Sequence, residues 1–184
     1  MIITVDDLLQ KHLKDEVFII ETDTVYGLGC LINSREGAEK ILKIKHRPLE
    51  KHFSVLVSNL VQVSELTKNF ESSIDLINSY WPGAVTFIFE KSQNVPIFVS
   101  SDASVGLRMP DNANTLKVIE KFGPLIMTSV NITGEPPVVK FEDTLKFEKA
   151  VDFIVRGGDL NNIPSTVFDI RTHEVLRQGR VKIK

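Results

Sequence analysis

The sequence predicts an α/β domain built around one mixed, twisted β-sheet. Uninterrupted apolar runs at 17–20 and 124–127 are typical of strands that are covered on both faces. Between such runs, apolar residues recur at helical spacing, as from Ala38 to Ile44. A chain of 184 residues fits one domain with a substantial core, and no repeat or linker divides it. We therefore expect residues 1–184 to form a single domain.

Capping residues mark the helices of the first third of the chain. Thr4 and Ser34 precede amphipathic segments, and each can accept a hydrogen bond from the first helical turn. Pro48 cannot continue a helix, so the second one must end before it. The expected elements are a short helix after Thr4, a strand at 17–20, a helix over about 34–46 and a strand at about 53–58.

Turn-forming residues separate the later elements. Trp81-Pro82-Gly83 ends a helical region, Pro110 ends a strand, and Asn112 or Asn114 can cap a helix. Residues 171–173 join two apolar segments and predict a hairpin. The expected elements are short helical stretches from 60 to 79, strands at 84–89 and 105–110, a helix through 122, a strand at 124–127, a helix at 143–150 and strands at 152–155, 166–170 and 174–176.

Composition and charge exclude several classes of protein. The net charge of −2 provides no overall field that would attract nucleic acid or an anionic membrane. No apolar run approaches the roughly 18 residues of a transmembrane helix, and the N-terminus lacks the pattern of a signal peptide. We expect a cytoplasmic protein with no membrane association. The single cysteine, Cys30, excludes an internal disulfide and is expected to be a small buried hydrophobic residue rather than a nucleophile.

Familiar catalytic and metal-binding motifs are absent from the sequence. There is no P-loop, no dinucleotide-binding fingerprint and no nucleophile elbow. The four histidines lack the spacing of zinc ligands, so we expect no metal held by the protein itself. Candidate chemistry is therefore carried by basic and hydroxyl side chains.

A basic turn at 45–51 is the first candidate site. It carries Lys45, Arg47 and Lys51 between a predicted helix and a predicted strand. Lys45 and Arg47 are two residues apart on a turning backbone, so both can reach one anion, Arg with a planar fork and Lys as a point charge. The alternative is that these cations only complement the helix dipole, which is worth about 0.3–1 kcal/mol each.

Polar loops follow several of the predicted strands. They lie at 22–24, 129–131 and 165–166, and Arg108 sits inside a strand. In open α/β sheets, ligands bind where strand ends and their loops converge, and hydroxyl and amide groups there can hold a small polar molecule. Taken singly, each loop can equally be an ordinary side-chain turn, and Arg108 can pair with a carboxylate of the core.

Seven short motifs occur in order along the chain. They are Thr22-Asp23-Thr24-Val25-Tyr26-Gly27-Leu28, Lys45-x-Arg47-Pro48 with Lys51, Trp81-Pro82-Gly83-x-Val85-Thr86, Arg108-Met109-Pro110, Ser129-x-Asn131-x-x-Gly134, Pro164-Ser165-Thr166-Val167 and Leu176-Arg177-x-Gly179. Together they resemble the YrdC-type domain of the threonylcarbamoyl-AMP synthases, and the resemblance spans nearly the whole chain. It implies a twisted α/β sheet around a deep basic cavity. It also implies an enzyme that joins L-threonine, bicarbonate and ATP into threonylcarbamoyl-adenylate and releases pyrophosphate.

The same resemblance implies a role for individual residues. Mg²⁺ would arrive with ATP, and the product would serve other proteins that modify tRNA, so that contact with tRNA would be indirect. Lys45, Arg47 and Lys51 would bind phosphate, and Lys45 and Arg47 would also be catalytic. The ATP site would be completed by Ser129, Asn131 and Arg177. Threonine would be held by Thr24, Arg108 and Ser165. Relatives often have proline in place of Glu21 and near His52. Glu21 is expected to face away from the site or to pair with a lysine.

Two other functions remain open from the residues. One is an RNA-binding module, which the acidic net charge and the 8% aromatic content disfavour. The other is transfer of a carbamoyl group from carbamoyl phosphate in metalloenzyme maturation, for which the chain lacks partner domains.

Arg108 allows a specific expectation about its surroundings. Val105 and Leu107 should face the apolar core, so Arg108 should project from the other face, where Gly106 leaves room. A buried arginine needs an anion. We expect that anion to be the carboxylate of threonine, which leaves the guanidinium of the protein itself hydrated and poorly paired. The rival is a permanent ion pair with an internal carboxylate.

Overall fold

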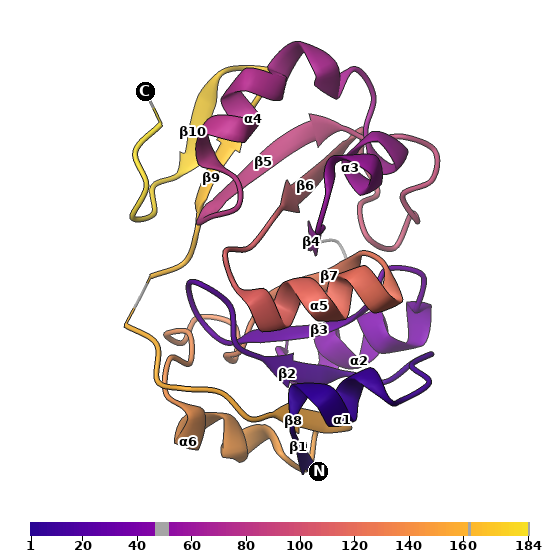
Figure 1. The fold of residues 1–184 in the computed structure, drawn as a ribbon, viewed down its shortest axis with the longest axis vertical. Helices are drawn as coiled ribbons and strands as arrows, with labels where there is room; N and C mark the ends of the chain where they lie inside the picture. Colours follow the sequence, from indigo (N-terminus) through magenta and orange to yellow (C-terminus); the bar gives the residue numbers. More distant parts are fainter. Residues whose placement is uncertain (47–51, 162, 184) are drawn as a thin grey trace.

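One twisted, mixed sheet carries the architecture of the described chain, residues 1–46, 52–161 and 163–183 of the computed structural model (Figure 1). Its strands are β1 (Ile2–Ile3), β2 (Phe18–Ile20), β3 (Gly27–Leu31), β4 (Ser54–Leu56), β5 (Val85–Glu90), β6 (Ser104–Arg108), β7 (Leu125–Ser129), β8 (Phe153–Val155), β9 (Thr166–Asp169) and β10 (Glu174–Arg177). They lie in the order β1-β8-β2-β3-β7-β4-β6-β5-β9-β10. The sheet contains parallel pairs, such as β4 with β6, and antiparallel pairs, such as β4 with β7, so the predicted mixed sheet is confirmed.

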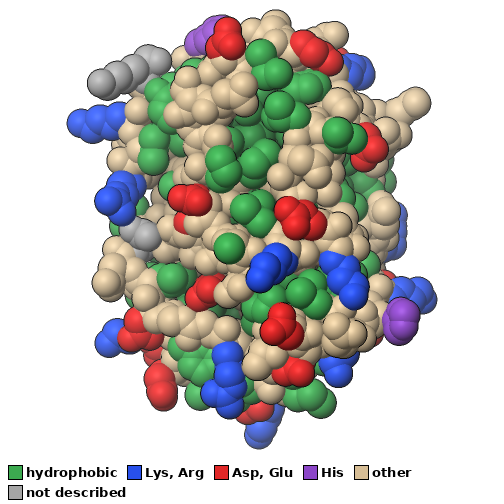
Figure 2. Space-filling view, in the orientation of Figure 1, with side chains coloured by type: hydrophobic (Ala, Val, Ile, Leu, Met, Phe, Trp, Pro, Cys, Tyr) green, Lys and Arg blue, Asp and Glu red, His purple; other side chains and the backbone are tan. Residues whose placement is uncertain are grey.

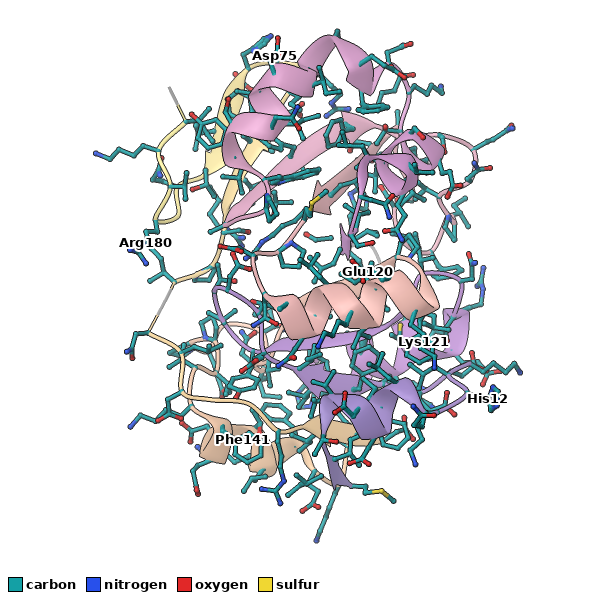
Figure 3. All side chains as sticks on the ribbon, in the orientation of Figure 1. His12, Asp75, Glu120, Lys121, Phe141 and Arg180 are labelled. Atoms are coloured by element: carbon teal, nitrogen blue, oxygen red, sulfur yellow. The ribbon has the colours of Figure 1, made fainter. Side chains whose placement is uncertain are left out.

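Helices cover both faces of this sheet (Figure 1). They are α1 (Val5–Leu9), α2 (Arg35–Ile44), α3 (Leu60–Leu66), α4 (Ile74–Tyr80), α5 (Ala113–Phe122) and α6 (Phe141–Thr144), with 3₁₀ turns at Phe70–Ser73 and Leu145–Phe147. A small core that includes Leu8 and Ile119 lies beneath α1 and α5. A larger core, to which α2, α3 and α4 contribute, fills the rest of the molecule. Lys121 on α5 donates to the carbonyl of Leu9 and so links the two helices of the small core (Figure 3).

Local sequence signals explain where the helices begin. Thr4, Ser34 and Asn112 are N-caps, as predicted, and each side chain accepts a backbone N–H of its first turn. The helix predicted at 143–150 is shorter and begins earlier: α6 runs from Phe141 to Thr144 and continues as a 3₁₀ turn. The Phe141 ring, labelled in Figure 3, packs with its centroid 6.5 Å from that of Tyr26. The predicted hairpin is confirmed as β9 and β10.

The strand β3 was not expected from the sequence. Its residues 27–31 include two glycines, Gly27 and Gly29, and glycines normally weaken a strand. Here β3 lies between β2 and β7 in the sheet, and the side chain of Met127 lies against both glycines. A Cβ atom at Gly27 would come within 2.4 Å of the Met127 sulfur, so the missing side chains allow the close packing. The glycines thus mark close contact within the sheet and not a loop.

Charge is distributed evenly over the face seen in Figure 2, where acidic and basic side chains are interspersed. None of the helices in the described ranges is long and apolar enough to cross a membrane. A mixed surface of this kind agrees with the small net charge of the chain.

Candidate functional site

A cavity of about 180 Å³ lies over the middle of the sheet, where the ends of β3, β5, β6, β7 and β9 converge. Five residues that the sequence singled out line it together: Thr24, Arg108, Ser129, Ser165 and Arg177. They come from five segments of the chain, so their convergence is a result of the fold. Lys45 donates to the Ser129 carbonyl, and Asn131 accepts from the Ser129 hydroxyl, so both contact this set. Arg47 and Lys51 lie outside the described residues.

Arg108 projects into this cavity from the end of β6, opposite to the core face. Val105 and Leu107 are buried in the larger core, and Gly106 leaves space beside Ile88, Thr86 and Ser54, as predicted. The expectation of a poorly paired guanidinium is wrong. Arg108 forms an ion pair with Asp23, and it donates from Nη1 to Thr24 Oγ1 at 2.9 Å and from Nε to the Gly83 carbonyl at 3.0 Å.

Both partners of the ion pair are largely removed from water, so each charge needs the other as its counterion. The side chain of Arg108 is 7% exposed and that of Asp23 is 12% exposed. Burial lowers the pKa of Arg108 from its ordinary value; the charge of Asp23 opposes that shift and the positive charge of Arg177 adds to it. A guanidinium has five N–H groups, and the described residues accept three of those of Arg108. One N–H on each terminal nitrogen therefore remains for a ligand.

Ser165 is held at the start of β9 by Arg177 of β10. Arg177 donates from Nε to the Ser165 carbonyl at 3.0 Å and from Nη2 to Ser165 Oγ at 3.2 Å. Arg177 is an exposed residue that also lines the cavity, and partial loss of water lowers its pKa. Thr86 on β5 completes the group, with its hydroxyl 2.8 Å from that of Ser165.

Gly179 explains the last of the sequence motifs. A Cβ atom there would lie 2.5 Å from the Pro164 carbonyl oxygen and 2.5 Å from the Thr166 nitrogen. The backbone of the segment after β10 can approach the start of β9 this closely only without a side chain. Gly179 also donates its N–H to Thr166 Oγ1 at 3.0 Å. The glycine thus brings Arg177 within reach of Ser165.

Lys45 joins the basic turn to the loop that follows β7. Its Nζ donates to the Ser129 carbonyl at 2.6 Å, to the Asn131 carbonyl at 3.0 Å and to Asn131 Oδ1 at 2.8 Å. Ser129 Oγ donates to the same Asn131 Oδ1 at 2.7 Å. Lys45 is buried at the end of α2, so it organises the Ser129–Asn131 loop directly.

Glu21 lies outside the lining of the cavity, whereas His52 is part of it. The Glu21 carboxylate does not line the cavity, and within the described part of the chain it bonds no lysine; it accepts from Asn114 Nδ2 at 3.2 Å and from the Gly158 N–H at 3.1 Å. Burial, with a smaller effect of Glu21, raises the pKa of the nearby Tyr26 to about 12. His52 does line the cavity, and its Nε2 is 3.2 Å from Ser101 Oγ. Glu21 therefore has a structural role, while His52 belongs to the site.

Three residues of the site were missed in the sequence. Asp23 lies within a recognised motif, but nothing in the sequence connects it with Arg108, 85 positions away. Thr86 ends the motif that begins at Trp81 but was given no role of its own, and His52 belongs to none of the motifs. Among the described residues, no cluster of three or more His, Cys, Asp or Glu side chains could hold a metal ion.

A sheet of this topology, with a cavity lined by arginines and hydroxyls at converging strand ends, defines a small-molecule-binding α/β protein. The model of the Sua5/YciO/YrdC family, described as "Telomere recombination", matches residues 10–179. The chain belongs to this family.

Similar proteins agree with this assignment. The threonylcarbamoyl-AMP synthase of Vibrio campbellii is 33% identical over 95% of this chain and 98% of its own length. The crystal structure of E. coli YciO superposes with a TM-score of 0.86 at 28% identity and covers 98% of this chain and 91% of that one. The structure of P. abyssi Sua5 complexed with L-threonine has a TM-score of 0.90 at 26% identity. The match covers 97% of this chain but only 57% of the Sua5 chain.

Proposed function

We propose that this protein is an L-threonylcarbamoyladenylate synthase, a nucleotidyltransferase that makes threonylcarbamoyl-AMP and pyrophosphate from L-threonine, bicarbonate and ATP. The observation that carries the proposal is the convergence of Thr24, Arg108, Ser129, Ser165 and Arg177 on one cavity. The relatives named threonylcarbamoyl-AMP synthase and the threonine complex of Sua5 support it. The product would feed the N6-threonylcarbamoyladenosine modification of tRNA in the cytoplasm, through downstream transfer proteins.

The reaction requires positioning and charge neutralisation more than covalent catalysis. The amine of threonine forms an N–C bond with bicarbonate, which loses water, and the resulting carbamate oxygen then attacks the α-phosphorus of ATP while pyrophosphate leaves. Neither step needs a nucleophile from the protein, so a site with cations and hydroxyls and no catalytic triad suits it.

On this proposal, threonine is held mainly by Arg108 and Thr24. The two remaining N–H groups of Arg108 suit the two oxygens of a carboxylate. Thr24 Oγ1 accepts from Arg108 and keeps one lone pair that can accept from the ammonium group of threonine. Ser165 completes the threonine site.

The ATP site, on the same proposal, lies along the basic turn. Arg47 and Lys51 neutralise the phosphates, Lys45 orders the loop that presents Ser129 and Asn131, and Arg177 meets the nucleotide. The described lining of the cavity contains no carboxylate. Mg²⁺ would therefore be held by triphosphate oxygens and water, and it would neutralise charge on the leaving pyrophosphate.

Calorimetry and product analysis test the proposal. We expect ATP to bind, threonine to bind the ATP complex, and pyrophosphate release to require both threonine and bicarbonate, with threonylcarbamoyl-AMP identified by mass spectrometry. An RNA-binding module would ignore threonine. A carbamoyl-phosphate enzyme would turn over without it, and either result would reject the proposal.

A further inference from the structure

The hydroxyl protons of the cavity can be assigned individually, because each hydroxyl donates only one hydrogen bond. Thr22 donates to the Val25 carbonyl at 2.7 Å, so in its 3.0 Å contact with Thr24 it must be the acceptor. Thr24 therefore donates to Thr22 and accepts from Arg108. The proton of Thr24 is used within the protein, and its hydroxyl acts on threonine mainly by positioning Arg108.

Two further lining hydroxyls are also committed as donors. Tyr26 donates to the Gly158 carbonyl at 2.7 Å, and Ser129 donates to Asn131 Oδ1 at 2.7 Å. Ser54 and Thr128 line the cavity but are only half-buried, so water can satisfy them. None of these four groups needs a ligand as its hydrogen-bond partner.

The pair formed by Thr86 and Ser165 differs from all of these. Thr86 is 2% exposed and Ser165 is 5% exposed, so water reaches neither freely. Arg177 has only donors, so Ser165 Oγ must accept from it. The single bond between the two hydroxyls uses one proton. Whichever way this bond points, one hydroxyl proton of the pair has no acceptor among the described residues, while at least one lone pair also stays open.

We propose that Thr86 and Ser165 together form the subsite that recognises the side-chain hydroxyl of the amino-acid substrate, with Thr86 as a specificity-determining residue. This inference rests on the proposed function. A buried donor beside a buried lone pair matches a group that both accepts and donates, which is the hydroxyl of threonine. Valine has nearly the same shape but would leave a buried donor unpaired. Arg177 acts as a positioning residue, since it donates to both the carbonyl and the hydroxyl oxygen of Ser165.

The test compares kcat/KM for threonine and valine, measured as pyrophosphate release with ATP and bicarbonate. The wild type should prefer threonine by roughly tenfold to a hundredfold, the effect of one unpaired buried donor. Thr86→Val and Ser165→Ala should each lower this ratio, because each leaves only one of the two hydroxyls to bond the hydroxyl of the substrate. The double variant should bring the ratio close to one. Thr86→Ser keeps the hydroxyl and should keep the preference.

Several readouts separate recognition from damage to the fold. Thr86→Val keeps the side-chain volume but loses the bond to the Ser165 hydroxyl, so the melting temperature should fall modestly, while ATP affinity should change little. A double variant that retains the wild-type ratio would overturn the proposal. If the double variant does not fold, an unchanged ratio in Thr86→Val overturns it instead. A wild type that forms no adenylate from threonine would reject the proposed function itself, which is a different result from equal use of threonine and valine.

Discussion

Arg108 and Asp23 form an ion pair across the candidate site, between the end of β6 and the loop after β2. The pair joins two sequence motifs that are 85 residues apart. It gives Arg108 a permanent anion and leaves two N–H groups for a ligand, so one side chain serves both the stability of the fold and the binding of substrate.

We therefore expect Arg108→Met to act on stability and on activity together. Removing one partner leaves the other charge uncompensated, which costs about 3–5 kcal/mol in the free energy of unfolding. Use of threonine should be lost while ATP still binds. Asp23→Asn should also destabilise the protein, and the double variant should be less destabilised than the sum of the singles. Urea denaturation of the four proteins measures this coupling. Strict additivity of the two changes in unfolding free energy would show that Arg108 and Asp23 are not energetically linked. Preserved threonine turnover in Arg108→Met would show that Arg108 does not bind the substrate.

Lys45 allows a second prediction about the link between the basic turn and the loop after β7. Lys45→Met removes three hydrogen bonds to Ser129 and Asn131, so we expect a loss of about 1.5–3 kcal/mol in stability and weaker ATP binding. Lys43→Ala, an exposed lysine on the same helix, is the matched control and should change stability by less than about 1 kcal/mol. Calorimetry with ATP and chemical denaturation measure the two effects. Equal behaviour of the two variants would mean that Lys45 contributes only to the helix dipole.

How far the sequence predicts the structure depends on the range of the interaction. The caps at Thr4, Ser34 and Asn112 and the β9–β10 hairpin are local, and all were predicted. The convergence of the motifs on one site was predicted from their polar residues at strand ends. The partner of Arg108 and the strand β3 were not, because both depend on which segments become neighbours in the sheet. Thr86 belongs to a recognised motif, but its pairing with Ser165, 79 positions away, could not be read from the sequence.

Cys30 gives a prediction about alkaline pH. Burial, the largest cause, raises the pKa of its thiol from 9.0 to about 12. The native thiol should thus stay protonated and resist alkylation at pH 8, and react only after unfolding. Because the folded pKa is the higher one, the stability that Cys30 contributes is full below pH 9 and is lost as the pH rises toward 12. Between pH 8 and pH 10, the wild type should lose about 1.4 kcal/mol more than Cys30→Ala in urea denaturation. Rapid labelling of the native protein at pH 8 would contradict the buried assignment.

Gly179 and Gly158 provide a matched test of the contact between the C-terminal segment and β9. An alanine Cβ at Gly179 would meet backbone atoms of Pro164 and Thr166 at 2.5 Å, so the backbone must shift, at a cost of about 1–3 kcal/mol. That shift moves Arg177 away from Ser165, and we expect kcat/KM for threonine to fall with it. At Gly158 a Cβ would have nothing within 4 Å, so Gly158→Ala should be tolerated or slightly stabilising. Thermal melts and steady-state kinetics of the two variants distinguish the cases. Normal activity in a folded Gly179→Ala protein would show that the close approach is not needed to position Arg177.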